Sequence, residues 1–367
     1  MTRLANQHDA INLAQGFPNF PAPDVLKEAA IEAIKQDVNQ YAITWGAKRL
    51  RDAISCRYAE WYGMEVDPEE EITVTCGSTE AMASTLLSIV DPGDQVIVFD
   101  PFYENYGPDT ILCDASPVHI PMGVGEELDA ERLADAFSNR TRAIILNTPN
   151  NPTGKVFSLE ELEAIAALCQ QYDAYAVTDE IYEHIVYEGR HIPIATIPGM
   201  RDRTITISGA SKTFSITGWR VGTIIAPGGV TDAIRKVHDF LTVGAPAPLQ
   251  EGVAAGLELL GRDYYDSLLA DYTVRREVMC RGLVEAGFQC DAPQGSYYVL
   301  ADFTALSDLP DDEFSYWLTS EIGVAVVPGS SFYSSPENGR ELVRFAFCKT
   351  VDVLEEAVRR LMALRHR

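Results

Sequence analysis

The stretch "SGASKTFSITGWRVG" at residues 208–222 sets one lysine, Lys212, among small and hydroxyl side chains. It continues the β-rich run "RTITISG" at 203–209, and Arg220 follows the lysine eight positions later. A lysine at such a position is usually a solvated loop residue, because a charged amine is cheapest to place in water. The surrounding chain shows why this lysine stands at the end of a strand.

Apolar β-rich runs alternate with amphipathic helical stretches on both sides of this segment. The other runs predicted as strands are 71–76, 94–100, 141–147, 174–180 and 221–227. Helical patterns cover 77–90 and 158–172, and the second opens with Ser158 and Glu161 at capping-box spacing. Short continuous apolar strands that alternate with helices predict an α/β fold, a three-layer α/β/α domain with a mostly parallel sheet covered on both faces.

The pattern changes after about residue 250. A long helical stretch at 248–287, interrupted near Gly261, leads into shorter strands and a final helix at 352–367. The first 37 residues indicate an irregular segment followed by one helix. We therefore predict a large domain at 38–245 and a smaller α+β domain formed by 1–37 and 246–367.

Composition excludes several classes of function. The chain has 367 residues with 29 basic and 54 acidic side chains, which gives 29 − 54 = −25. Such a field disfavours nucleic acid and anionic membranes as partners, and no run approaches the roughly 18 apolar residues that span a bilayer. Seven dispersed cysteines, without a C-x-x-C pair or a His cluster at ligand spacing, predict reduced thiols and no metal site. Because the N-terminal residues also lack a signal-peptide pattern, we expect a cytoplasmic protein.

Polar residues follow the ends of the predicted strands, which is where ligands bind in parallel sheets. These residues are Gly77-Ser78-Thr79, the segment "DPFYENY" at 100–106, Asn147 with "TPNNPTG" at 148–154, Asp179 with Tyr182, and Lys212. Each alone has an ordinary interpretation as a helix cap, a turn or a loop residue. Together they indicate a site for a planar, phosphorylated, heteroaromatic molecule.

The chain resembles fold-type I pyridoxal-phosphate enzymes, and within them the class I aminotransferases of the aspartate aminotransferase superfamily. It is most similar to the kynurenine, glutamine and methionine aminotransferase branch. The motifs that carry the resemblance are "INLAQGFPNFPAPD" (11–24), "NQYAITWG" (39–46), "NTPNNPTG" (147–154), "DEIYE" (179–183), "SKTFSITGWRVG" (211–222), "APAPLQ" (245–250) and "RFAFCK" (344–349). They extend over essentially the whole chain.

The resemblance implies that pyridoxal 5′-phosphate is the cofactor and assigns residues to it. Lys212 would form a Schiff base with the cofactor and shuttle the reaction's proton. Asp179 would keep the pyridine nitrogen protonated, because a carboxylate at hydrogen-bonding distance raises the pKa of that nitrogen. Asn151 and Tyr182 would bind the ring's phenolate oxygen, and Tyr103 would stack on the ring face.

The resemblance also assigns the phosphate and the substrate. The phosphate would be bound by Ser78, Thr79, Ser208, Ser211 and Arg220. Arg344 would bind the α-carboxylate of the substrate, because its planar fork matches a carboxylate, with Gly16 and Asn151 beside it. Tyr41 would reach the phosphate of the neighbouring subunit, which implies a homodimer.

The expected reaction is transfer of an amino group between an L-amino acid and a 2-oxo acid. "GFPNFP" at 16–21, with Tyr41 and Trp45, favours aromatic amino acids, methionine, kynurenine or glutamine as donors. Thr79 stands where an aspartate-specific branch carries a lysine. An aspartate-type aminotransferase and a pyridoxal-phosphate-dependent carbon–sulfur β-lyase remain alternatives on the same scaffold.

Two further classes are disfavoured. A pyridoxal-phosphate-sensing transcription regulator would need a helix-turn-helix module, for which the sequence ahead of Ile11 leaves no room. A nicotinamide dehydrogenase would need G-x-G-x-x-G after the first strand, which the chain lacks. Relatives in the aminotransferase family usually carry roughly 20 more residues at the N-terminus, in an arm that packs on the partner subunit. Either the start of this sequence is assigned late, or the arm is absent and substrate access or dimer stability is expected to differ.

Overall fold

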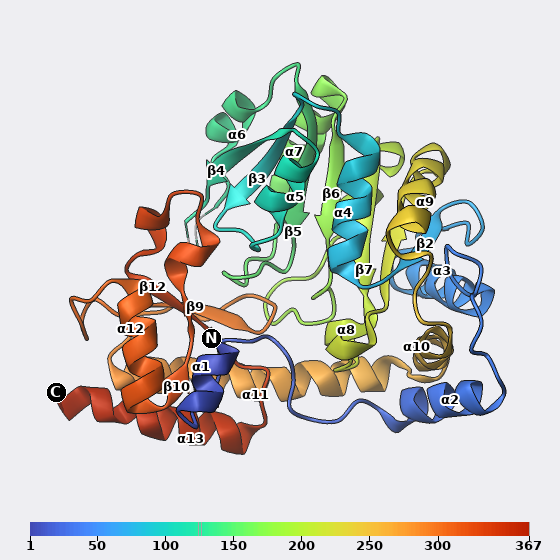
Figure 1. Ribbon diagram of the computed structural model, residues 1–367. Helices are drawn as coiled ribbons and strands as arrows, with labels where there is room; N and C mark the ends of the chain where they lie inside the picture. The colour runs from blue at the N-terminus through green and yellow to red at the C-terminus, as the bar shows by residue number, and fades with distance from the viewer. Residues whose placement is uncertain (124, 126, 367) are drawn as a thin grey trace.

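The computed structural model describes residues 1–123, 125 and 127–366, and its largest element is a seven-stranded sheet (Figure 1). The strands are β2 (Ile72–Thr75), β3 (Gln95–Asp100), β4 (Ser116–Pro121), β5 (Thr141–Asn147), β6 (Tyr175–Asp179), β7 (Thr204–Gly209) and β8 (Gly222–Ile225). Their spatial order is β2-β8-β7-β6-β5-β3-β4. Only β8 in this sheet runs antiparallel to its neighbours, so the predicted mostly parallel sheet is confirmed.

Helices cover both faces of this sheet. Ile145 of β5 packs in the core shared with α4 (Ser78–Ile89), whereas the preceding Ile144 packs in the core that contains α7 (Leu159–Tyr172). The same two faces are also covered by α5 (Tyr106–Leu112), α6 (Ala130–Ala136) and α9 (Gly228–Thr242). Successive strand residues point to opposite faces, so burial on both sides explains the continuous apolar runs.

Most predicted boundaries agree with the structure to within a few residues, and β4 and α1 are among the elements that the sequence patterns did not predict. Strand β4 is an edge strand with a mostly part-exposed surface and prolines at 117 and 121, which are tolerated at an edge. Helix α1 (Thr2–Gln7) is too short to show a helical period. The C-terminal helix is also shorter than expected, since α13 (Val351–Leu361) gives way to a 3₁₀ turn.

The C-terminal part builds two smaller sheets that enclose a separate core. An antiparallel sheet has the order β11-β12-β9, and β1 pairs with β10 in parallel. These strands are β1 (Ile11–Asn12), β9 (Tyr298–Asp302), β10 (Val324–Ala325), β11 (Val327–Pro328) and β12 (Leu342–Ala346). Helices α11 (Arg262–Ala286), α12 (Asp311–Trp317) and α13 pack around them, and Figure 1 shows α1 beside these C-terminal elements.

A third core joins the N-terminal helices to the chain after the sheet. Helix α10 (Ala247–Leu259) packs on α2 (Asp24–Lys35) and α3 (Lys48–Tyr62). Gly256 allows this contact, because a β-carbon there would lie 2.7 Å from the Leu26 side chain. The predicted interruption of the long helical stretch is confirmed, since α10 ends before Gly261 and α11 starts after it.

Short turns complete the fold. They are the single-turn helix α8 (Ala210–Thr213), 3₁₀ turns at Ile194–Thr196, Arg201–Arg203, Thr217–Trp219, Gly329–Phe332, Pro336–Gly339 and Met362–His366, and a π-helical turn at Leu318–Ile322. Within the described residues, no helix combines the length and the apolar character that crossing a membrane requires.

Candidate active site

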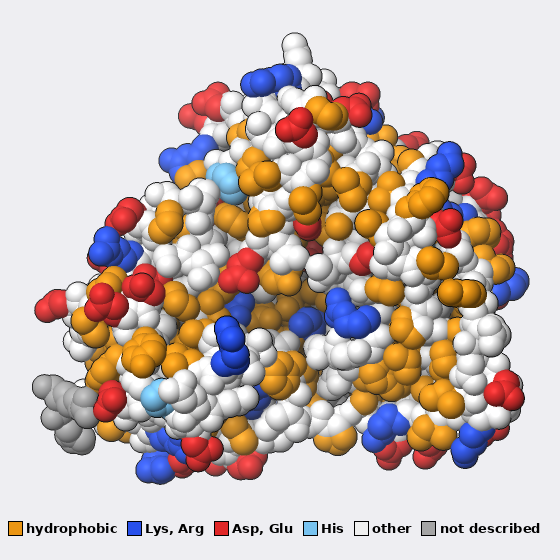
Figure 2. All heavy atoms as spheres, in the orientation of Figure 1, with side chains coloured by type: hydrophobic (Ala, Val, Ile, Leu, Met, Phe, Trp, Pro, Cys, Tyr) orange, Lys and Arg blue, Asp and Glu red, His pale blue; other side chains and the backbone are white. Residues whose placement is uncertain are grey.

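A cavity of about 670 Å³ lies where β5, β6 and β7 end, between the large sheet and the small antiparallel sheet. Figure 2 shows a hollow on this face, with Lys and Arg side chains around a hydrophobic floor. The residues singled out from the sequence that line the cavity are Gly16, Ser78, Thr79, Tyr103, Asn151, Asp179, Tyr182, Ser211, Lys212, Arg220 and Arg344. The fold therefore brings together side chains from widely separated motifs.

Two of the sequence-predicted residues lie elsewhere. Ser208 is directed away from the cavity, because its Oγ donates a 2.7 Å hydrogen bond to Glu183 Oε1 outside the lining. Tyr41 is 85% exposed on the segment before α3 and does not line the cavity. Ser208 is therefore not placed to bind a phosphate in this cavity, and the other predicted phosphate-binding residues must do so. Tyr41 can contribute only to a site outside its own chain.

Lys212 lies deep in the cavity. Its Nζ donates to the Gly16 carbonyl at 3.1 Å and lies 5.8 Å from the ring centres of Tyr182 and Tyr297. Burial is the largest influence on this amine and lowers its pKa to about 8, against the opposing attraction of Asp179. An amine with such a pKa is partly neutral near neutral pH, so Lys212 can act as a nucleophile and as a base.

Asp179 forms the floor of the cavity at the end of β6 and is 6% exposed. Burial raises the pKa of its carboxyl group to about 6, although Tyr106 opposes this by donating a 2.7 Å hydrogen bond to Oδ2. The Ile181 amide donates to the other oxygen at 3.3 Å. A buried carboxylate gains most from a cationic partner, so this position suits a protonated ring nitrogen.

Gly77, Ser78, Thr79 and Arg220 form an anion cup at the N-terminus of α4. Gly77 has a φ of +84°, and a β-carbon there would lie 2.2 Å from Arg220 Nη2. No side chain caps the first turn of α4 from the preceding residue. A helix N-terminus beside a guanidinium is a strong site for a phosphate, because both present positive charge and N–H donors.

The whole chain matches one protein family. The profile for "Aminotransferase class I and II" matches residues 8–361. The chain belongs to the class I and II aminotransferase family. It is therefore a transaminase, and the predicted family, fold class and reaction type are confirmed.

Individual relatives of this aminotransferase are similar over nearly their full length. A probable N-succinyldiaminopimelate aminotransferase DapC of Mycobacterium tuberculosis (strain ATCC 25618 / H37Rv) is 39% identical, over 100% of this chain and 95% of the relative. Human kynurenine–oxoglutarate transaminase 1 is 38% identical, over 98% of this chain and 94% of the relative. The solved structure of a methionine aminotransferase from Escherichia coli has a TM-score of 0.94 at 36% identity and covers 99% of this chain and 96% of that chain.

Members of this family use pyridoxal phosphate. The aminotransferase cavity fits that group in three respects. The anion cup suits its phosphate, the buried Asp179 carboxyl suits its ring nitrogen, and the Lys212 amine suits its aldehyde. The three features line one cavity, as a single compact ligand requires.

Arg344 lies on β12 at the wall of the aminotransferase cavity. Its Nη1 donates to Asn151 Oδ1 at 2.8 Å, and its Nη2 donates to the Ala14 carbonyl at 2.7 Å. Its buried Nε has no hydrogen-bond partner. Both acceptors are neutral oxygens, so the guanidinium charge is available to a substrate carboxylate.

The remaining predicted residues shape the cavity between these charges. Tyr182 Oη lies 3.1 Å from Tyr298 Oη, and burial raises the pKa of the Tyr182 phenol well above its ordinary value. The backbone N–H of Asn151 donates a 2.7 Å hydrogen bond to Asn147 Oδ1, and this bond fixes the turn after β5. The Tyr103 ring packs edge-on against a neighbouring tyrosine at the cavity wall.

The segment around Gly16 closes the cavity opposite the large sheet. Its carbonyl accepts hydrogen bonds from Lys212 and, at 2.8 Å, from Tyr297. A β-carbon at Gly16 would lie 1.8 Å from Tyr298 Oη, so only glycine fits here. The next residue, Phe17, lines the cavity with a ring that is 40% exposed.

Sequence reasoning gave no role to two residues of the site, Tyr106 and Tyr298. Tyr106 had a weak signal, since it stands one helical turn after Tyr103 in "DPFYENY". Asn147, which the sequence analysis names at a strand end without a role, donates from Nδ2 to the Asp179 carbonyl at 2.9 Å. Tyr298 had no signal, as it belongs to a β9 strand that no motif marks.

One cluster of possible metal ligands lies outside this cavity. Ligand atoms of Glu180, Glu183 and His191 lie within 4.8 Å of one another. Each is already hydrogen-bonded: Thr178 donates to Glu180, His191 Nε2 lies 2.8 Å from the same carboxylate, and Ser208 donates to Glu183. The sequence analysis, which predicted no metal site, did not bring these three together.

Proposed function

We propose that this aminotransferase binds pyridoxal phosphate covalently through Lys212 and moves an amino group from an L-amino acid with an uncharged side chain to a 2-oxo acid. The observation that carries this proposal is the convergence of Lys212, Asp179, Arg344 and the anion cup on one cavity. The cavity thus offers an amine, a carboxylate, a phosphate site and a substrate-carboxylate site to one pair of ligands.

Each residue then has a chemical task. When bound, pyridoxal phosphate supplies an aldehyde that carries the amino group and a ring that accepts electrons. Lys212 Nζ would take the proton from the substrate Cα and hold it for delivery to a second carbon, which its lowered pKa favours. Asp179 holds the ring-nitrogen proton, Arg344 orients the substrate, and Tyr182 donates to the phenolate oxygen.

The choice of donor follows from the charges that line the cavity. Among the described residues, its lysine and arginine side chains are Lys212, Arg220 and Arg344, and all three already have a task. A side-chain carboxylate, as in aspartate or glutamate, would therefore find no further lysine or arginine among the described residues of the lining. The rings of Phe17 and Tyr103 favour aromatic amino acids, methionine, kynurenine or glutamine.

A second candidate donor is N-succinyldiaminopimelate, which is favoured by a specific similarity. The solved N-succinyldiaminopimelate aminotransferase from Mycobacterium tuberculosis has a TM-score of 0.96 at 40% identity, and the match covers 99% of this chain and 96% of that chain. The names of other relatives support kynurenine and methionine instead. Because that donor carries additional carboxylates, it needs a further arginine or lysine, which the described lining lacks, and we rank it second.

We further propose that the enzyme works as a homodimer. Tyr41 and Ile43 are 85% and 51% exposed, and Phe240 on α9 is 92% exposed. The two segments touch, because His238 Nε2 lies 2.8 Å from the Thr44 carbonyl. An apolar surface of this kind supports a subunit interface that carries Tyr41 toward the partner's anion cup.

We propose the cytoplasm as its location. All seven cysteines are free thiols. Reduced cysteines are typical of the cytosol, where glutathione and thioredoxin prevent disulfides.

One experiment tests the reaction and the donor together. The enzyme, loaded with pyridoxal phosphate, is mixed with methionine, phenylalanine, kynurenine, glutamine, aspartate and N-succinyl-L,L-diaminopimelate in turn. We expect donors with uncharged side chains to remove the visible absorbance of the bound cofactor. These donors should also yield their 2-oxo acids when 2-oxoglutarate is present. Fastest turnover with the succinylated donor would reverse the ranking, and pyruvate from L-cystathionine without an acceptor would indicate the β-lyase.

A further inference from the structure

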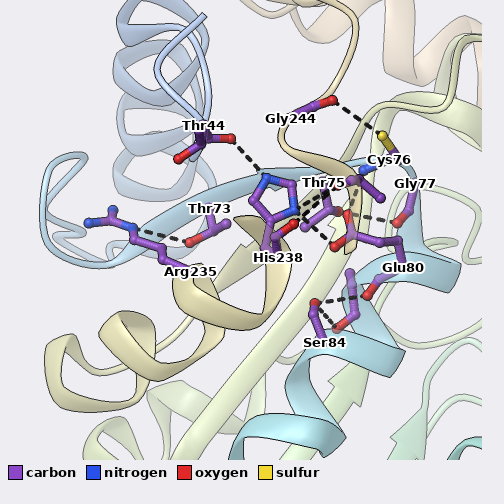
Figure 3. A network of polar contacts seen from close by, with 12 residues as sticks. Thr44, Thr73, Thr75, Cys76, Gly77, Glu80, Ser84, Arg235, His238 and Gly244 are labelled. Atoms are coloured by element: carbon purple, nitrogen blue, oxygen red, sulfur yellow. Dashed lines mark hydrogen bonds and ion pairs between the residues drawn. The ribbon is translucent and has the colours of Figure 1, made fainter. Parts of the chain in front are cut away.

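His238 is a fully buried histidine on α9 that does not line the cavity (Figure 3). Its Nδ1 lies 2.9 Å from Glu80 Oε1, and its Nε2 lies 2.8 Å from the Thr44 carbonyl oxygen. The ring therefore joins three separate segments of the chain: α9, the first turn of α4, and the segment before α3. None of the motifs that indicate the reaction contains it.

The contacts with Glu80 and Thr44 determine the protonation of the ring, and Thr242 Oγ1, on the same helix, lies 3.2 Å from Nδ1. A backbone carbonyl only accepts hydrogen bonds, so His238 Nε2 carries a proton. Glu80 Oε2 accepts from the Cys76 amide at 2.7 Å, as an ionised carboxylate does. The facing Oε1 then accepts from Nδ1, and the ring is an imidazolium paired with a carboxylate.

The surrounding charges agree with this state. Burial opposes protonation most strongly, but the hydrogen bond and the charge of Glu80, the Thr44 carbonyl and Asp239 outweigh it, and the pKa of His238 is raised. From α9 itself, Arg235 is turned to the β2 side, where it donates to the Thr73 hydroxyl. From the turn after β2, the Cys76 thiol faces the Gly244 carbonyl at 3.6 Å.

Glu80 connects this imidazolium to the anion cup. It is the third residue of α4, directly after Ser78 and Thr79, and its carboxylate also holds the Cys76 amide on the other side of Gly77. The Glu80 side chain thus spans the turn from which the cup's N–H groups project. Its own position depends on His238, because that ring is its one ionic partner among the described residues.

We propose that His238 is a positioning residue for the anion cup: paired with Glu80 and anchored to Thr44, it fixes the turn 76–80 in the geometry that binds a phosphate. The inference rests on the proposed function, in which the cup holds the cofactor phosphate. Without the ring, Glu80 is free to leave the Cys76 amide, and the cup must be ordered by the ligand. That ordering cost weakens phosphate binding without touching the rest of the site.

The test compares two ligands that differ only in the phosphate. Pyridoxine 5′-phosphate and pyridoxine lack an aldehyde, so neither bonds to Lys212. Their dissociation constants are measured by calorimetry on the full chain, freed of cofactor, for the unchanged protein, His238→Gln, Glu80→Gln and the double variant. We expect His238→Gln to raise the dissociation constant of pyridoxine 5′-phosphate about tenfold and that of pyridoxine less than about twofold.

A second, partly buried histidine provides the control. His184 lies between the rings of Trp61 and Tyr265, with ring centres 4.8 and 4.5 Å away, and does not line the cavity. We expect His184→Gln to change the dissociation constants of both ligands by the same factor, since it affects only general packing. We also expect faster amide exchange at residues 76–80 in His238→Gln and not in His184→Gln.

The outcomes separate the two proposals. If the unchanged protein binds both ligands equally, the cup does not hold the phosphate, and the proposed function fails. If it prefers the phosphate ester and His238→Gln weakens both ligands equally, or neither, the positioning role is overturned. Should His238→Gln not fold, Glu80→Gln decides the question, because it removes the same ion pair and must show the same selective loss. If the double variant loses no more affinity for pyridoxine 5′-phosphate than the single variants do, His238 and Glu80 act together as proposed. If the two losses of affinity add, they act independently and the proposal is contradicted.

Discussion

Tyr106 donates a 2.7 Å hydrogen bond to Oδ2 of Asp179 from the first turn of α5. Both side chains are buried, so this phenol is the main protein group that favours the ionised carboxyl over the protonated one. Burial acts in the opposite direction and is the larger effect, since it raises the pKa of Asp179 from 3.8 to about 6. The chain thus holds a carboxylate ready for a cation that it does not itself provide.

Tyr106→Phe should shift this balance further. The cofactor-free protein loses stability as pH rises from about 4 to about 6, because the folded state binds the Asp179 proton more tightly than the unfolded state does. Without the Tyr106 phenol, the pKa of Asp179 in the folded state rises further, and the loss of stability extends to higher pH. Melting temperatures recorded between pH 4 and 8 check this, and an unchanged profile would contradict the role of Tyr106.

Asp179→Asn should separate stability from activity. The variant removes a buried carboxyl whose ionisation costs on the order of 3 kcal/mol at neutral pH, so the cofactor-free protein should be more stable at pH 8. Turnover should fall by more than about 100-fold, because the ring-nitrogen proton loses its partner. Denaturant unfolding and steady-state rates give the two quantities, and a variant that is both less stable and active would refute the assignment.

Gly77→Ala tests the anion cup. A β-carbon at this position would displace Arg220, so pyridoxine 5′-phosphate should bind more than about tenfold more weakly. Gly63→Ala is the control, because Gly63 also has a positive φ, +65°, and no atom of the described residues lies within 4 Å of the added carbon. Gly63→Ala should lose about 1 kcal/mol of stability from its left-handed backbone, and Gly77→Ala should lose more, because its ψ of 167° places it in a region that is essentially confined to glycine. Equal ligand affinities in the two would show that the cup is not the phosphate site.

Lys212→Ala should abolish covalent attachment of the cofactor. In the unchanged protein, borohydride treatment after loading with pyridoxal phosphate should label one tryptic peptide, which contains Lys212. Lys349 is an internal control, since it is buried with a lowered pKa and donates to the Phe17 carbonyl but does not itself line the cavity. Mass spectrometry reads the label, and its appearance on Lys349 in place of Lys212 would reassign the attachment site.

Arg344→Lys should impair substrate binding and spare the cofactor. The lysine keeps the charge but loses the fork, so kcat/KM for a preferred donor should fall about 100-fold, mainly through KM. The affinity for pyridoxine 5′-phosphate should stay within about twofold, because the anion cup is unchanged. A variant with native KM would remove Arg344 from the carboxylate site.

Much of this site could be predicted because strand ends carry strong local signals. The turn after β2 needs glycine, and Lys212 follows a run whose apolar character identifies a buried strand. The direction of Ser208 could not be predicted, since one residue's shift in a strand exchanges the two faces. Tyr298 and the contact between His238 and Thr44 depend on tertiary packing, which no local pattern encodes.

The pairing of β1 with β10 has a consequence for biosynthesis. Ile11 aligns with Val324, and the Gly16 carbonyl that closes the pocket follows directly from this strand. A ribosome-bound chain can assemble the large sheet early, because β2 to β8 lie within its first two thirds. Its opening residues must nevertheless wait for a partner translated near the end. Competence for catalysis is therefore acquired only as synthesis finishes, because β10 and the β12 strand that carries Arg344 are among the last elements to be translated.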